Sequence, residues 1–97
     1  MLAKNKPGRS EDYLDYIRSR PCCVCQAIPA EPHHTARGGT SVKGSDFSAI
    51  PMCRDHHREV GDSGVETFQR ENNISIAIAV AKHLITWADE NWADKEK

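Results

Sequence analysis

The residues best suited to chemistry are cysteines and histidines that occur in short, regular groups. Cys22 and Cys25 form a C-x2-C pair, and Cys53 and His56 form a C-x2-H pair. Two such pairs supply the four thiolate and imidazole ligands that a tetrahedral structural Zn²⁺ requires. We therefore predict one structural zinc held by these four residues. The alternative is a set of ordinary cysteines, with one incidental disulfide at most.

Cys23 is left outside that ligand set. A site that pairs Cys23 with Cys25 is a second possibility, but a C-x-C pair closes less easily around a single zinc. The 27 residues between Cys25 and Cys53 exceed the spacing of the shortest zinc modules. We therefore expect the intervening segment to have a further function.

Four of the five histidines form two adjacent pairs, His33-His34 and His56-His57. If His56 binds zinc, His57 points about 100° away around a helix and is left for another role. The zinc would join the two ligand pairs and so bring the first histidine pair close to His57. Two neutral imidazoles can hold a divalent metal with open positions for water and substrate, and an adjacent histidine can accept a proton. This combination predicts metal-dependent phosphodiester hydrolysis; exposed loop histidines are the alternative.

The stretch from PCCVC through EPHH and a glycine-rich loop to IPMCRDHHRE resembles the HNH endonucleases, whose fold is the ββα-metal or His-Me finger. The resemblance covers residues 21–60 and is closest to small phage and prophage enzymes with zinc knuckles, some of which nick DNA. It implies a DNA endonuclease with one catalytic Mg²⁺ or Mn²⁺, replaceable in vitro by Ni²⁺ or Zn²⁺, besides the structural zinc. It also implies products with a 3′ hydroxyl and a 5′ phosphate. A single site cuts one strand per visit, so a monomer would nick DNA, and a double-strand break would need two sites or repeated attack.

The resemblance assigns roles to individual residues by position. His34 corresponds to the general base, and His33 and His57 correspond to the protein ligands of the catalytic metal. His56 stands where the commoner pattern has the final zinc cysteine. The family's asparagine is replaced by Ser48, whose shorter side chain can make one bond to the backbone near the base.

Asp46 is a second replacement for the missing asparagine, because it lies two residues before Ser48. Its carboxylate could hold the loop between the strands in shape, or it could ligate the catalytic metal. The sequence does not decide between these roles. For both residues the alternative is an ordinary turn-forming side chain.

Four basic residues are candidates for phosphate contacts, namely Arg37, Lys43, Arg54 and Arg58. The last two are four residues apart on a predicted helix and share a face. Residues 1–58 carry nine Lys and Arg against six Asp and Glu, whereas residues 59–97 carry four against eight. Phosphate contacts give affinity without sequence choice, so we expect DNA binding with little sequence preference. Solvated surface charge is the alternative.

The elements that must position these residues are short. After a loose arm over residues 1–9, Ser10 is a predicted N-cap for an amphipathic helix over residues 11–19. Residues 47–51 are predicted to form a strand that leads into Cys53. The run RDHHREV is predicted to be helical until Gly61 and Gly64 break it, and residues 65–71 to form one or two further turns.

The longest predicted element is a C-terminal helix over residues 74–92, which Asn73 could cap. Its apolar residues recur at the spacing of one helix face, and we expect that face to be the main hydrophobic surface. The residues on it are Ile76, Ala77, Val80, Ala81, Leu84, Ile85 and Ala88. Trp87 is expected in the core, and Trp92 to pack on the N-terminal helix or on a second subunit.

With 97 residues, the chain is long enough for one small α+β domain with a thin core, for which a metal is a common supplement. It has no apolar run long enough to span a membrane and no signal peptide, so we expect a cytoplasmic protein. Whether it is a monomer or a dimer, and whether phage packaging or recombination proteins are partners, stays open. The competing functions are a catalytically inactive zinc-stabilised nucleic-acid-binding module and a redox or metal sensor built on the CCVC cluster.

Overall fold

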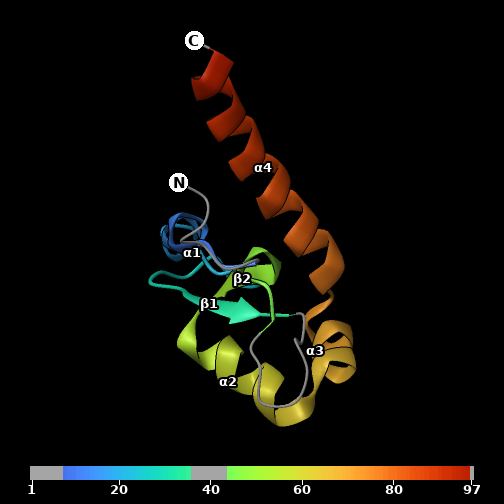
Figure 1. Ribbon diagram of the computed structural model, residues 1–97. Helices are drawn as coiled ribbons and strands as arrows, with labels where there is room; N and C mark the ends of the chain where they lie inside the picture. The colour runs from blue at the N-terminus through green and yellow to red at the C-terminus, as the bar shows by residue number, and fades with distance from the viewer. Residues whose placement is uncertain (1–7, 36–43, 97) are drawn as a thin grey trace.

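The computed structural model describes residues 8–35 and 44–96, with side chains described through Trp92 (Figure 1). It confirms a small α+β fold in which a two-stranded antiparallel sheet is surrounded by four helices. None of the helices in the described part of the chain is long and apolar enough to cross a membrane. The elements in chain order are α1 (Glu11–Arg18), β1 (Glu31–His34), the 3₁₀ turn η2 (Asp46–Ser48), β2 (Ala49–Met52), α2 (Arg54–Ser63), α3 (Val65–Asn72) and α4 (Ile76–Glu96).

The two strands form the centre of the fold. They pair so that His33 lies opposite Ile50 and His34 lies opposite Ala49. Every residue of β2 is buried. The predicted strand over residues 47–51 begins later than expected, because η2 occupies its first positions and the Ser45 hydroxyl caps that turn by accepting from the Phe47 amide.

Helix α1 was predicted correctly. The Ser10 hydroxyl accepts a hydrogen bond from the Tyr13 amide at 3.1 Å, as an N-cap residue should. Tyr13 and Ile17 are fully buried, and the Tyr13 ring packs edge-on against Trp87 of α4 with ring centroids 5.2 Å apart. The expected place of Trp87 in the core is confirmed.

Helix boundaries further along the chain differ from the expectation at two points. Gly61 does not break α2, because a single exposed glycine lowers the stability of a helix only modestly. The helix ends instead at Gly64, whose φ is +89°. Asn73 does not cap α4. It ends α3 in the left-handed conformation with φ of +54°, and the Ser75 hydroxyl accepts from the Ile78 amide at the start of α4 instead.

Helix α4 buries only part of the predicted face, since Ile76, Val80 and Leu84 pack on the core as expected. Its contacts with the core come from Ile76, Ala79, Val80, Leu84 and Trp87. The expected core positions Ala77, Ala81, Ile85 and Ala88 are all exposed. The reason is that this helix is apolar on more than one side, so periodicity alone does not identify its buried face. Helix α4 also continues well beyond the body of the protein (Figure 1).

Candidate functional site

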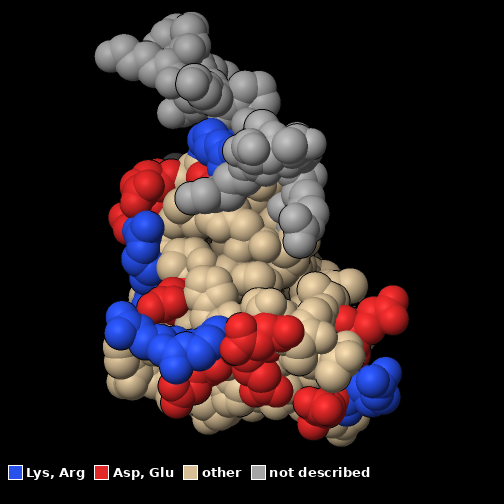
Figure 2. Space-filling model, turned by 90° about the horizontal axis from the view of Figure 1, so that it is seen from below, with Lys and Arg blue, Asp and Glu red and all other residues tan. Residues whose placement is uncertain are grey.

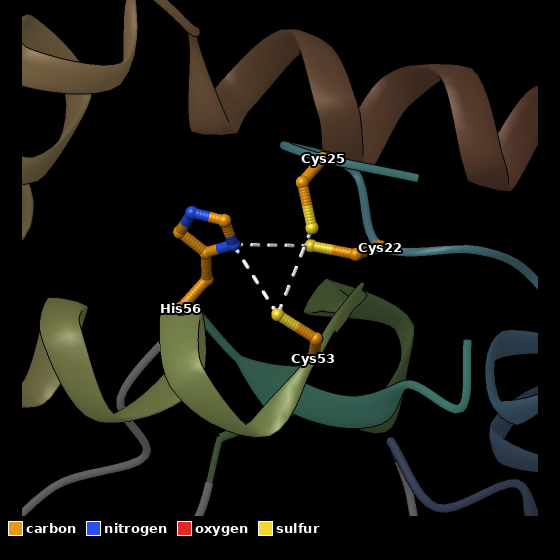
Figure 3. Close-up of side chains that lie close together, drawn as sticks. All are labelled: Cys22, Cys25, Cys53 and His56. Carbon is orange, nitrogen blue, oxygen red and sulfur yellow. Dashed lines mark hydrogen bonds between the residues drawn. The ribbon is translucent and has the colours of Figure 1, made fainter. Parts of the chain in front are cut away.

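The predicted zinc ligands meet at one point of the structure. Cys22 and Cys25 come from the turn before β1, and Cys53 and His56 come from the start of α2 (Figure 3). The four ligand atoms all lie within 4.8 Å of one another. The Nδ1 atom of His56 is 3.6 Å from the Cys22 sulfur and 3.3 Å from the Cys53 sulfur, and the sulfurs of Cys25 and Cys53 are 3.8 Å apart.

These distances fit one tetrahedral zinc. Zinc–sulfur bonds of about 2.3 Å place the ligand atoms of a tetrahedron roughly 3.5–3.8 Å apart. The cluster could therefore hold one Zn²⁺ without rearrangement of the backbone. The backbone amide of Cys23 donates to the Pro51 carbonyl at 2.9 Å, which fixes the cysteine turn to β2.

The electrostatic environment of the Cys22 thiol differs from that of its neighbour Cys23. Burial raises the pKa of the Cys22 thiol, but hydrogen bonds from nearby backbone amides and from His56 outweigh it and lower that pKa to about 6. Cys22 is thus disposed to form the thiolate that binds metal. Burial, together with the nearby Cys22, raises the pKa of Cys23 to about 11. A high pKa is the opposite of what a reactive sensor thiol needs.

His33 and His57, one from each adjacent histidine pair of the sequence, lie close together as predicted. The rings of His33 on β1 and His57 on α2 lie edge-to-face with centroids 4.9 Å apart. Burial and the neighbouring charges of His57 and His34 lower the pKa of His33 to about 4. His33 is therefore neutral at pH 7, which is the form that ligates a metal.

Glu31 completes this group, and sequence reasoning missed it. Its Oε1 atom lies 2.7 Å from Nδ1 of His57, and this hydrogen bond is the main cause that lowers the Glu31 carboxyl pKa. A carboxylate on one ring nitrogen orients a histidine whose other nitrogen binds a metal. The available signal was strand periodicity, since Glu31 and His33 are two residues apart and share a face of β1.

His34 faces the other side of β1 and has a partner of its own. Its Nε2 atom lies 2.8 Å from Oδ1 of Asp46, whose residue is 5% exposed. Asp46 also accepts from the Ser10 amide at 2.8 Å and from Arg9 at 3.0 Å. Although burial raises the Asp46 pKa, these donors outweigh it and lower that pKa. The geometry favours Asp46 as a positioning residue over the metal-ligand role also considered for it.

Ser48 supports the chain beside His34 through its backbone. Its carbonyl accepts from the Thr35 hydroxyl at 2.9 Å and from the Thr35 amide at 3.4 Å. The Ser48 hydroxyl donates to the Ser45 carbonyl at 2.7 Å. The Ser48 backbone and side chain thus hold the chain beside His34, whereas the Asp46 carboxylate contacts the His34 ring directly.

The structure describes two of the four basic residues that are candidates for phosphate contacts. Arg54 and Arg58 are exposed on α2 and, with Glu31 and His57, line one shallow pocket of about 410 Å³. Arg37 and Lys43 lie outside the described residues. On the face shown in Figure 2, basic side chains lie directly beside acidic ones, so that the described part of this face is not uniformly basic.

The predicted loose arm is described only at its end. Arg9 is held there by hydrogen bonds to the Asp46 carboxylate and to the Gly44 carbonyl. Residues 1–7 lie outside the described part.

Comparison with known proteins identifies a family whose function is not described. The chain matches the family described as "Protein of unknown function (DUF968)" over residues 1–90. It belongs to the DUF968 family. It is 32% identical over 62 residues to the uncharacterized protein YdfU of Escherichia coli (strain K12). The matched stretch is 61% of this DUF968 chain and covers 18% of YdfU. No solved structure gives a significant match.

The cysteine cluster yields a direct prediction about metal content. We expect one zinc per chain in the purified protein, measured by elemental analysis. Cys25→Ser removes a ligand and should leave far less than one zinc after dialysis against a mild chelator. Cys23→Ser is the matched control and should keep the metal. The opposite result for the two variants would place Cys23 in the ligand set.

The His33 environment predicts an unusual titration. With zinc bound and no other divalent metal, the imidazole resonances of His33 should stay in the neutral form from pH 7 down to near pH 4 in an NMR titration. The unfolded chain protonates this ring near 6.5, so the stability that His33 contributes is present above that pH and is lost as the pH falls toward 4. A folded-state midpoint near 6.5 would contradict this placement.

Proposed function

We propose that this protein is a metal-dependent DNA endonuclease of the HNH type. The observation that carries the proposal is the pairing of His33 with His57 across β1 and α2, with Glu31 behind His57. The succession β1, β2 and α2 is the order of elements that the ββα-metal fold requires. The resemblance of residues 21–60 to HNH endonucleases adds the expected chemistry.

The chemistry of the donor set fits a catalytic divalent metal. His33 and His57 offer two imidazole nitrogens, and the nearby Glu31 carboxylate suits the harder ions Mg²⁺ and Mn²⁺. Two protein nitrogens leave positions open for water and phosphate oxygens, which is the character of a catalytic site. When bound, the ion supplies charge stabilisation of the scissile phosphate and of the leaving oxygen.

His34 is the proposed general base. Its Nε2 is occupied by Asp46 at 2.8 Å, so its Nδ1 is the nitrogen left to accept a proton from water. The Asp46 carboxylate orients the ring and stabilises the positive charge that develops on it, as a carboxylate does behind other catalytic histidines.

The Cys₃His cluster has a structural role in this proposal. Zinc with four protein ligands is closed to substrate and contributes to folding. It would hold the start of α2, and with it His57, against the turn that leads into β1. Arg54 and Arg58 would then contact backbone phosphates, which supports nicking with little sequence preference. The proposed cellular setting is the cytoplasm, and a packaging or recombination partner would supply the choice of DNA.

A binding module without catalysis is the second candidate, and the absence of the family's asparagine is what favours it. Such a module would keep the zinc cluster and the exposed arginines but would have no use for a base. The His34–Asp46 pair argues against it, because that pair places a buried carboxylate behind a histidine. A redox sensor is disfavoured by the raised pKa of Cys23.

The test is a supercoiled-plasmid assay with the zinc-loaded protein after loosely bound metal has been removed. With Mg²⁺ or Mn²⁺ the wild type should produce open circles, and without metal it should not. His34→Ala should lower the rate by about 10²–10⁴-fold, the usual contribution of a general base. His57→Ala should weaken the dependence on Mn²⁺, requiring a higher metal concentration for the same rate.

His83→Ala is the matched control, since His83 lies on α4 and its Nδ1 donates to the Ala79 carbonyl. This variant should nick as fast as the wild type. If the wild type is inert in every metal while it is folded, contains zinc and binds DNA, the binding-module function replaces this proposal. Equal cutting by His34→Ala would identify a contaminating nuclease.

A further inference from the structure

The outer face of α4 carries an apolar stripe that no described part of the chain covers. Ile78 is 57% exposed, Ile85 is 61% exposed and Trp92 is 66% exposed. Each follows the previous one by seven residues. Ala81 and Ala88 are also exposed and lie between them. Trp92 therefore does not pack on α1, which was one of its two expected positions.

This spacing is that of a helix–helix seam. Residues 78, 81, 85, 88 and 92 alternate in steps of three and four, which is the a/d repeat of two helices that pack along their length. The opposite face of α4 is already used by the core through Ile76, Val80, Leu84 and Trp87. The stripe is thus a second apolar face and needs a separate partner.

We propose that this stripe pairs with the same stripe of a second copy of the chain, with the two α4 helices antiparallel. The size of the side chains is the first argument. In an antiparallel pair centred between Ile85 and Ala88, Ile85 meets the partner's Ala88 and Trp92 meets the partner's Ala81. In these two layers a large side chain faces a small one, and the two helices can approach closely at the centre of the seam.

Charge complementarity fixes the direction. Lys82 and Asp89 lie on the same flank of the stripe, seven residues apart, and both are exposed. Neither has an ion-pair partner among residues 8–35 and 44–92. In the antiparallel pair this flank faces itself, so Lys82 meets the partner's Asp89, and the symmetry of the dimer forms the contact twice.

A parallel pair would lose these contacts. Its Lys82 flank would face the other flank of the partner, which carries the uncharged residues Ala77, Leu84 and Asn91. It would also stack Trp92 on the partner's Trp92 and leave alanine opposite alanine. The arrangement of sizes and charges therefore selects the antiparallel dimer.

The experiment is sedimentation velocity on the full, zinc-loaded chain over a range of concentrations. The mass should rise from that of the 10.8 kDa chain to twice that value. Ile85→Glu should weaken the dimer on the order of 100-fold, because it places an unpaired charge at the centre of the seam. Ile28→Glu is the matched control, since Ile28 is 76% exposed and is not part of α4; it should dimerise like the wild type.

A charge exchange tests the direction of the helices. Lys82→Asp alone and Asp89→Lys alone should each weaken the dimer by about tenfold, because each creates two like-charge contacts. The double variant with both changes should recover the wild-type affinity. A monomer at every concentration would overturn the proposal, and so would a dimer that Ile85→Glu leaves intact. Failure of the double variant to recover would overturn the antiparallel arrangement.

Discussion

The structure depends on one constraint, the convergence of the Cys22–Cys25 turn and the first turn of α2 on a single tetrahedral point. The two segments are far apart in sequence, and the β1–β2 pair lies between them. With so few fully buried large side chains, burial alone gives this chain a thin core. A metal at the cluster would therefore fix the relation between β1 and α2, on which the His33–His57 contact depends.

The alternation of a β-strand explains why two adjacent histidines have different surroundings. His33 faces α2, where burial and a second histidine keep it neutral, whereas His34 faces α1 and η2, where a buried carboxylate holds it. In the proposed enzyme, the strand would thus separate the ligand role of His33 from the base role of His34. A dimer formed through α4 would carry two such sites, which is the number needed to cut both DNA strands in one encounter.

The Cys₃His set could be predicted because ligand type and spacing are local properties. The contact between His33 and His57 could be predicted from that set, because joining the two ligand pairs brings β1 close to α2. Helix α1 was also predictable, since its cap and apolar spacing are both in the sequence. Glu31 was missed although its spacing from His33 on one strand was a usable signal. The Asp46–His34 pair could not be predicted, because it depends on a turn that brings residue 46 back to residue 34. The buried face of α4 was predicted only in part, because the helix carries two apolar faces and sequence periodicity does not say which one the core covers.

We propose that His33 and His57 hold a catalytic metal separate from the zinc cluster. The most direct measurement is anomalous diffraction from crystals of the zinc-containing protein soaked in Mn²⁺, collected to distinguish the two elements. The account predicts a zinc peak among Cys22, Cys25, Cys53 and His56, and a manganese peak at coordination distance from His33 and His57. Manganese that enters only the cysteine cluster, or that never binds at the histidine pair, would contradict it.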